Sequence, residues 1–175
     1  MTIRLATIHD KDQIYQVHYQ AFSAEERNIV AELGVNLLSE KTTPPILSLV
    51  AEIESKVVGH IAFSPLTHQT SGPSIYLLGP LGILPEYQRQ SIGTRLIQDG
   101  IKQLKKQGVD VLIVYGDPAY YTRFGFNTET AINFLPPYKL EYPFGWLAMD
   151  LSSPYELPEP IELGCVQSLA DPKLW

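Results

Sequence analysis

Cysteine is almost absent from this sequence: its 175 residues include a single one, Cys165. One cysteine excludes an intrachain disulfide and makes a reducing compartment the expected one. Long apolar runs are absent as well, because the longest, Ile75 to Leu84, is too short to span a bilayer. These absences predict a cytoplasmic protein without a membrane partner.

Basic residues are outnumbered, because 13 Lys and Arg stand against 19 Asp and Glu, which gives a formal net charge of −6. Nucleic-acid-binding surfaces need an excess of positive charge, so the sequence argues against DNA or RNA as a partner. Metal-ligand spacing is absent too. The histidines His9, His18 and His68 form no such pattern with one another or with Cys165, and we expect no metal.

Hydrophobic residues make up 45% of the chain, enough to bury the core of one domain over residues 1–175. The hydrophobic periodicity predicts a mixed α/β fold. Strands are expected over 3–6, 46–54, 56–63, 75–84, 109–115 and 146–151, and helices over 10–22, 25–39, 92–107 and 118–124. Seven of the 14 prolines lie in the last forty residues, which predicts an irregular C-terminal extension apart from the strand near 146–151.

The most informative segment runs from Leu81 to Thr94. An apolar strand ends here, a loop carries Gln88, Arg89 and Gln90, and a helix begins directly afterwards. The start of such a helix presents unpaired N–H groups and the positive end of the helix dipole, which favour a phosphate. We therefore predict that a phosphorylated cofactor binds this loop.

The strand before the loop breaks the rules for a central strand, since it contains Gly79, Pro80 and Gly82. Such breaks occur where another molecule approaches the backbone. An extended, amide-bearing ligand such as the pantetheine arm of coenzyme A would pair with the backbone from Leu81 to Ile83. The alternative interpretation is a bulge at the edge of a sheet.

Two motifs carry a family resemblance. The segment Gln88-Arg89-Gln90-Ser91-Ile92-Gly93 resembles the Q/R-x-x-G-x-G/A signature of the GNAT superfamily of acetyltransferases. The segment from Gly116 to Phe126 resembles the tyrosine–x–x–x–Gly–Phe element that follows the fifth strand there, and it is most similar to a branch of bacterial predicted N-acetyltransferases with the sequence GDP-x-YY-x-RFGF. The order of elements from Ile3 to Phe126, about three quarters of the chain, matches as well.

The resemblance implies a central mixed, mostly antiparallel sheet of six to seven strands flanked by helices, with the fourth and fifth strands splayed for the cofactor. It also implies direct transfer of an acetyl group from acetyl-CoA to an amine, in a small molecule or a protein, within a ternary complex. The chain would act as a monomer or a homodimer. The residues expected to bind the cofactor are Leu81, Gly82, Ile83, Gln88, Arg89, Gln90, Ser91, Ile92, Gly93, Thr94, Tyr120 and Tyr121.

Ser91 departs from the signature, which usually has its first glycine at this position. A positive φ at Ser91 would cost on the order of 1 kcal/mol. A helical φ would be harmless, and the hydroxyl would then reach a phosphate oxygen. We favour the helical conformation. The signature also lacks the Gly-Lys-Ser/Thr of a P-loop and the three glycines of a dinucleotide fold, which argues against ATP and NAD.

Acetyl transfer to an amine needs a proton donor for the leaving thiolate. By the resemblance this donor is Tyr121, four residues before Gly125, and its phenol has a suitable pKa near 10. Tyr120 is the rival, because adjacent helical residues point about 100° apart and only one faces the cofactor.

The transfer also needs a base, and the strand over 75–84 lacks the glutamate that many relatives carry. His60 and Glu52 on the hairpin are candidate bases. Asp117 is a third, although a role as N-cap of the helix at Pro118 explains it better. Cys165 has no paired histidine motif, so we expect no covalent thiol mechanism.

The alternative function is a catalytically silent acyl-CoA-binding or sensor domain of the same fold. The missing glutamate favours this alternative, whereas the tyrosine element favours an enzyme. On the acceptor side, Glu25 and Glu26 form a candidate contact for a cation. The aromatic residues after Phe126 (Phe134, Tyr138, Tyr142, Phe144 and Trp146) are candidates for a pocket wall or, more simply, for a small core of their own.

Overall fold

The computed structural model describes all residues from 1 to 175, which form two compact units. The first unit contains residues 1–63 and 79–102, and the second contains 64–78 and 103–175. The strands of the large sheet are β1 (Thr2–Leu5), β2 (Leu47–Ile53), β3 (Lys56–Leu66), β4 (Ile75–Ile83), β5 (Val111–Tyr115) and β7 (Trp146–Asp150).

The large sheet has the order β1-β2-β3-β4-β5-β7. The pairs β1–β2, β2–β3 and β5–β7 are antiparallel, and β4–β5 is parallel. A second, two-stranded sheet pairs β6 (Phe134–Leu135) with β8 (Ile161–Glu162). The predicted mixed, mostly antiparallel sheet is therefore confirmed, with six strands in the main sheet.

In the first unit, the hairpin of β2 and β3 turns at Glu54 and Ser55, whose φ angles are 49° and 65°. Positive φ at both central residues matches the turn that suits the twist of paired strands. Successive residues of β3 then face opposite sides of the sheet. His60 contacts His18 of α1 (Lys11–Ala21), whereas a Cβ on Gly59 would lie 3.2 Å from Leu96 of α3 (Ile92–Lys106). Helices α1 and α3 thus cover opposite faces of this strand.

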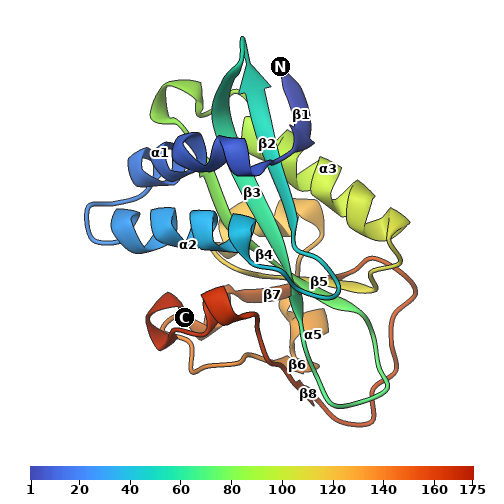
Figure 1. Ribbon diagram of the computed structural model, residues 1–175. Coiled ribbons are helices and arrows are strands. Elements are labelled where there is room, and N and C mark those ends of the chain that lie inside the picture. Colours follow the sequence, from blue (N-terminus) through green and yellow to red (C-terminus); the bar gives the residue numbers. More distant parts are fainter. The chain divides into compact units, whose positions relative to one another are not determined.

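Helix α2 (Arg27–Ser39) packs beside α1, as Figure 1 shows. The buried residues of α1 are Ile14, Val17 and His18, and those of α2 are Ala31, Leu33, Gly34 and Leu37. Their spacing of three and four positions is that of an apolar helix face. None of the helices combines the length and apolar character that crossing a bilayer requires.

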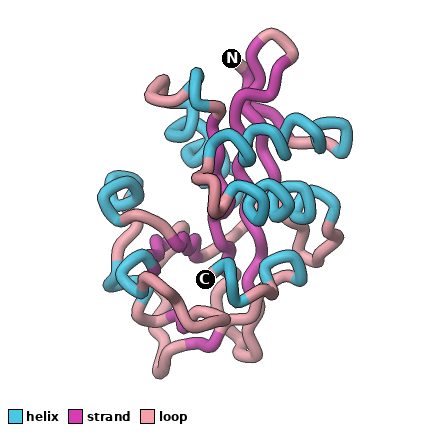
Figure 2. Tube along the Cα trace, turned by 90° about the vertical axis from the view of Figure 1, so that its left-hand side faces the viewer, coloured by secondary structure: helices cyan, strands magenta, loops and turns pink.

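In the second unit, β5 is buried over Val111 to Val114, as its continuous apolar sequence indicates. The chain then forms α4 (Pro118–Tyr121) and α5 (Thr128–Ala131). Loops make up most of the C-terminal region, which Figure 2 shows largely in pink around the C-terminus. The strand expected near 146–151 is present as β7 (Trp146–Asp150), and the region also contains the short strand β8, which was not predicted.

Candidate active site

The end of β4 provides the first part of the candidate site. Gly82 is buried, and a Cβ at this position would lie 3.2 Å from Val17 and still closer to His18, so α1 packs directly on the backbone here. The side-chain Nε2 of Gln88 donates a hydrogen bond to the carbonyl oxygen of Ile83 (3.1 Å). This bond ties the end of the strand to the loop that follows.

The loop after β4 is exposed from Gln88 to Ser91. The N–H of Leu84 donates to the carbonyl of Val58 (2.9 Å), which fixes the start of the loop on the neighbouring strand β3. Arg89 and Ser91 have φ angles of 58° and 61°. Left-handed residues next to other conformations turn backbone N–H groups toward one side, and such concavities bind anions.

The expectation that Ser91 is helical is wrong, since its φ of 61° lies in the left-handed region. Helix α3 begins one residue later, at Ile92. The missing glycine therefore costs on the order of 1 kcal/mol of backbone strain.

Helix α3 supplies the dipole at the end of this loop. The first intrahelical hydrogen bond is donated by the N–H of Arg95 to the carbonyl of Ser91 (3.0 Å). The N–H groups of Ile92 and Gly93 precede it, so neither has an acceptor within the helix. Together with the loop they form a site whose chemistry fits a pyrophosphate.

The tyrosine element belongs to the second unit. Asp117 caps α4 as expected, because its Oδ1 accepts a hydrogen bond from the N–H of Ala119 (2.9 Å). The ring of Tyr121 packs on Gly116, where a Cβ would lie 2.5 Å from Tyr121 Cε2. Burial raises the pKa of the Tyr121 phenol above its usual value, and the neighbouring Tyr120 adds to the rise. The phenol is therefore protonated at neutral pH.

Tyr120 has a different environment from Tyr121. The guanidinium carbon of Arg123 lies 4.1 Å from the centre of the Tyr120 ring, and the Tyr120 and Tyr121 rings meet edge to face at 5.0 Å. The positive charge of Arg123 thus lies over the face of the Tyr120 ring. The ring of Tyr121 is half-buried.

The two hairpin candidates for the base have other partners. Both ring nitrogens of His60 lie within hydrogen-bonding distance of side chains, Nδ1 of His18 Nε2 and Nε2 of Ser48 Oγ, and the residue has no exposed surface. Glu52 pairs with Arg4, which also holds Asp10. Neither His60 nor Glu52 presents an unengaged acceptor at the end of β4.

Sequence reasoning missed His18, which was considered only as a metal ligand. In the structure His18 is fully buried and its ring lies against Gly82. A signal was available, because His18 follows Ile14 and Val17 at the spacing of a buried helix face.

The remaining candidates lie apart from the loop in sequence. Glu25 and Glu26 are exposed, and both carboxylates accept a hydrogen bond from the Ser23 hydroxyl. In the second unit the Trp146 ring lies 6.1 Å from the Trp175 ring at a tilt of 57°, and its Nε1–H donates to the carbonyl of Phe134 (2.8 Å). The aromatic residues therefore divide into this buried group and the exposed residues Tyr142 and Phe144.

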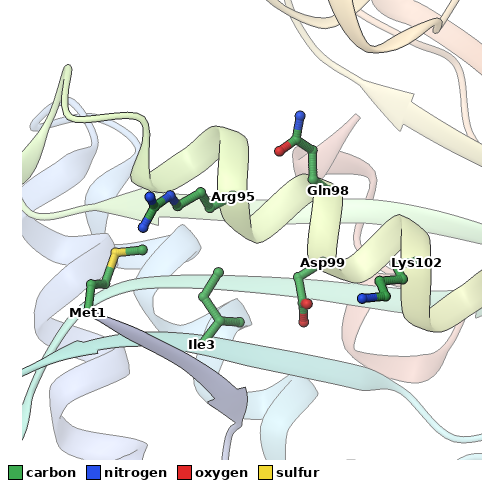
Figure 3. Close-up of a pocket in the computed structure, with 6 residues that line it drawn as sticks. All are labelled: Met1, Ile3, Arg95, Gln98, Asp99 and Lys102. Atoms are coloured by element: carbon green, nitrogen blue, oxygen red, sulfur yellow. The ribbon is translucent and has the colours of Figure 1, made fainter.

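A hollow of about 430 Å³ lies between β1 and α3. Figure 3 shows Met1, which precedes β1, and Ile3 on β1 facing the helix that carries Arg95, Asp99 and Lys102. None of the predicted cofactor residues lines it. No group of three or more His, Cys, Asp or Glu side chains is arranged to hold a metal ion.

The class of protein follows from one comparison. The model of the acetyltransferase (GNAT) family matches residues 11–126, which include the strand, the loop, α3 and the tyrosine element. This chain belongs to that family and is therefore an acyltransferase.

Individual relatives agree with this class. The chain is 34% identical over 163 residues to the uncharacterized N-acetyltransferase YjhQ of Escherichia coli (strain K12), across 87% of this chain and 88% of YjhQ. A GNAT family acetyltransferase from Brucella melitensis, solved in complex with acetyl-CoA, is 28% identical with a TM-score of 0.73, covering 96% of this chain and 97% of that one. YhbS from Escherichia coli, solved with CoA, shares the fold with a TM-score of 0.81 at 21% identity, covering 97% and 92%.

Proposed function

We propose that this chain transfers the acetyl group of acetyl-CoA to the amino group of an acceptor, by direct transfer within a ternary complex. The observation that carries the proposal is the exposed loop from Gln88 to Ser91, with two left-handed residues, placed at the start of α3. Acetyl-CoA in the Brucella relative supports the identity of the ligand.

Each part of the site has a task in this proposal. The backbone of Arg89 to Gly93 binds the pyrophosphate through N–H groups and the helix dipole. The backbone from Leu81 to Ile83 pairs with the amide-bearing arm and directs an N–H group at the thioester oxygen. When bound, acetyl-CoA supplies an activated acyl group, and the chain supplies its position.

The proposal assigns Tyr121 as the acid that protonates the leaving thiolate. Its phenol keeps its proton at neutral pH, since desolvation raises its pKa above the usual value. An acid of this kind is of use to an enzyme and not to a silent binding domain, so we prefer the enzyme. We place the chain in the bacterial N-acetyltransferase branch that carries the element from Gly116 to Phe126.

Replacing Tyr121 by Phe tests this role. Phenylalanine keeps the ring that packs on Gly116 and removes only the hydroxyl. We expect kcat to fall about 100-fold, within the usual range for general acids, while the Kd for acetyl-CoA stays within about twofold. Tyr120→Phe is the matched control and should retain most of the turnover.

The assay measures thiol release from acetyl-CoA in the presence of four amines: a polyamine, an arylalkylamine, an aminoglycoside and a peptide with a free α-amine. Turnover with one of them supports acetyl transfer. Binding of acetyl-CoA without turnover on any amine would favour the silent binding domain.

A further inference from the structure

Two exposed aromatic rings lie next to each other in the second unit, just before β7. The exposed fractions of Tyr142 and Phe144, hereafter the ring pair, are 54% and 64%. Their ring centres lie 5.9 Å apart in an edge-to-face arrangement. Large apolar side chains that gather on the surface instead of in a core mark places where another molecule binds.

The backbone that carries the ring pair is fixed at both ends. The N–H of Tyr142 donates a hydrogen bond to the Tyr115 hydroxyl (2.8 Å), and the N–H of Gly116 donates to the carbonyl of Gly145 (2.9 Å). Between them, the N–H of Gly145 closes a tight turn on the carbonyl of Tyr142 (2.9 Å). A loop held in this way presents its side chains in one arrangement, so little freedom is lost when a ligand binds.

Gly116 connects this loop to the proposed acid. A Cβ on Gly145 would lie 2.9 Å from the carbonyl oxygen of Gly116, so the two backbones are in direct contact. The Tyr121 ring packs on the same Gly116, where a Cβ would lie 2.5 Å from it. All these residues belong to the second unit. A molecule bound to the ring pair therefore lies beside the residue that supports Tyr121.

The chemistry of the loop favours an apolar ligand. Residues 142–146 read Tyr-Pro-Phe-Gly-Trp and contain no charged side chain. A polycationic acceptor would be recognised by carboxylates, which this segment lacks. An aromatic ring, in contrast, packs on the ring pair in the offset or edge-to-face geometry that such rings prefer.

We infer that the ring pair of Tyr142 and Phe144 binds the carbon skeleton of the acceptor, and that the acceptor is an arylalkylamine, a primary amine on a short chain that ends in an aromatic ring. The inference rests on the proposed acetyl transfer and names the substrate class of that reaction. The two rings select the acceptor, and Tyr121 acts on the thiolate that leaves when the amine has attacked.

The test uses phenethylamine as the acceptor and removes the rings without touching the backbone bonds. Tyr142→Ser and Phe144→Ser each remove one ring, and the double variant removes both. Tyr142→Phe keeps the ring and is the conservative replacement. Tyr155→Ser is the matched control, because it removes another exposed aromatic ring of the second unit (44%) that lies outside this loop.

Of the four amines in the assay, the arylalkylamine should have the highest kcat/KM in the wild type. Each single serine variant should raise the KM for phenethylamine about fivefold, and the double variant about 20-fold. Because binding is lost equally in the ground state and the transition state, kcat and the Kd for acetyl-CoA should stay within about twofold. Tyr142→Phe should restore most of the binding lost in Tyr142→Ser, and Tyr155→Ser should behave as the wild type does.

Two kinetic results would overturn the inference and leave the proposed function standing. One is an unchanged KM for phenethylamine in the double variant. The other is a wild type that prefers the polyamine, the aminoglycoside or the peptide. A third result, a change of oligomeric state in the double variant by size-exclusion chromatography, would assign the ring pair to a contact between two copies of the chain and would equally contradict the inference.

A binding measurement separates failure of the inference from failure of the proposed function. Saturation-transfer NMR detects bound phenethylamine without any turnover. We expect the strongest signals on the aromatic protons of the ligand, and we expect the double variant to lose them. If the wild type acetylates none of the four amines, the proposed function fails, and this experiment still decides the role of the ring pair. Equal signals with the wild type and the double variant, or no signal with either, would refute it.

Discussion

Acidification is the perturbation that tests the buried histidine pair most severely. Burial lowers the pKa of His18 to about 3, and burial together with the charge of His18 holds the pKa of His60 well below 6.5. In the unfolded chain both histidines titrate near 6.5. Below that pH the unfolded state binds protons at these histidines and the folded state does not, so the free energy of unfolding falls as the pH decreases.

The size of this effect follows from the linkage relation. Between pH 7 and pH 5, a histidine that stays neutral in the folded state and titrates at 6.5 in the unfolded state removes about 2 kcal/mol. His18 alone therefore removes about 2 kcal/mol, a sizeable part of the 5–15 kcal/mol typical of a folded domain, and His60 acts in the same direction. For a chain of this size the His18 contribution alone should lower the melting temperature by about 4 to 8 °C.

Urea denaturation at pH 7, 6 and 5 measures this loss directly. His18→Gln removes one of the two titrating groups, so its loss over the same range should be smaller than that of the wild type by about 2 kcal/mol. The exposed His9→Gln control should behave as the wild type does. A loss of unfolding free energy below about 1 kcal/mol in the wild type would mean that the folded state binds protons at these histidines. That result would refute the account of His18 and His60 as a neutral, buried pair.

Three further predictions concern the strand, the loop and the first turn of the fold. Ser91→Gly should leave the Kd for acetyl-CoA within about twofold, whereas Ser91→Pro, which cannot adopt a φ of 61°, should weaken it at least tenfold by calorimetry. Gly82→Ala places a Cβ 2.6 Å from His18 and should destabilise the protein by about 1–3 kcal/mol in urea; no loss would contradict this packing. The guanidinium of Arg4 lowers the pKa of Asp10 from 3.8 to about 2, so its stabilisation is present above pH 4 and lost toward pH 2. Because Arg4 is one-third exposed, screening leaves about 1 kcal/mol, and Asp10→Asn should abolish the pH dependence in that window.

The helices and strands were largely predictable because their local patterns are strong. The apolar spacing over 92–107 and Gly108 predicted a helix and its end, and α3 covers Ile92–Lys106 with Gly108 at a φ of 77°. Both halves of the hairpin were predicted as well, although β3 continues to Leu66. A turn such as Glu54-Ser55 carries no glycine, so its left-handed conformation was not visible in the sequence.

The conformation of Ser91 in the loop after β4 could not be predicted from the local sequence. A serine before a helix is compatible with a helical or a left-handed φ, and the structure has the left-handed one at Ser91. Its place in the family signature was predictable. Its conformation was not, because nothing in the residues next to it decides between the two.

The contact between the buried side chains of His18 and His60 could not be predicted from the sequence. His18 and His60 are 42 positions apart, and nothing in the spacing of either predicts that they meet. His60 was predicted as a base from its strand alone, and the structure places its ring between two other side chains. The role of Tyr121 stays a prediction that rests on the resemblance and on the raised pKa of its phenol.

The most direct test of the central claim is a calorimetric titration of the protein with acetyl-CoA, with ATP and NAD as controls. The account predicts selective binding in the micromolar range that is lost in Ser91→Pro and kept in Ser91→Gly. Absence of acetyl-CoA binding, or equal binding of ATP, would contradict the assignment of the loop from Gln88 to Thr94 as the cofactor site.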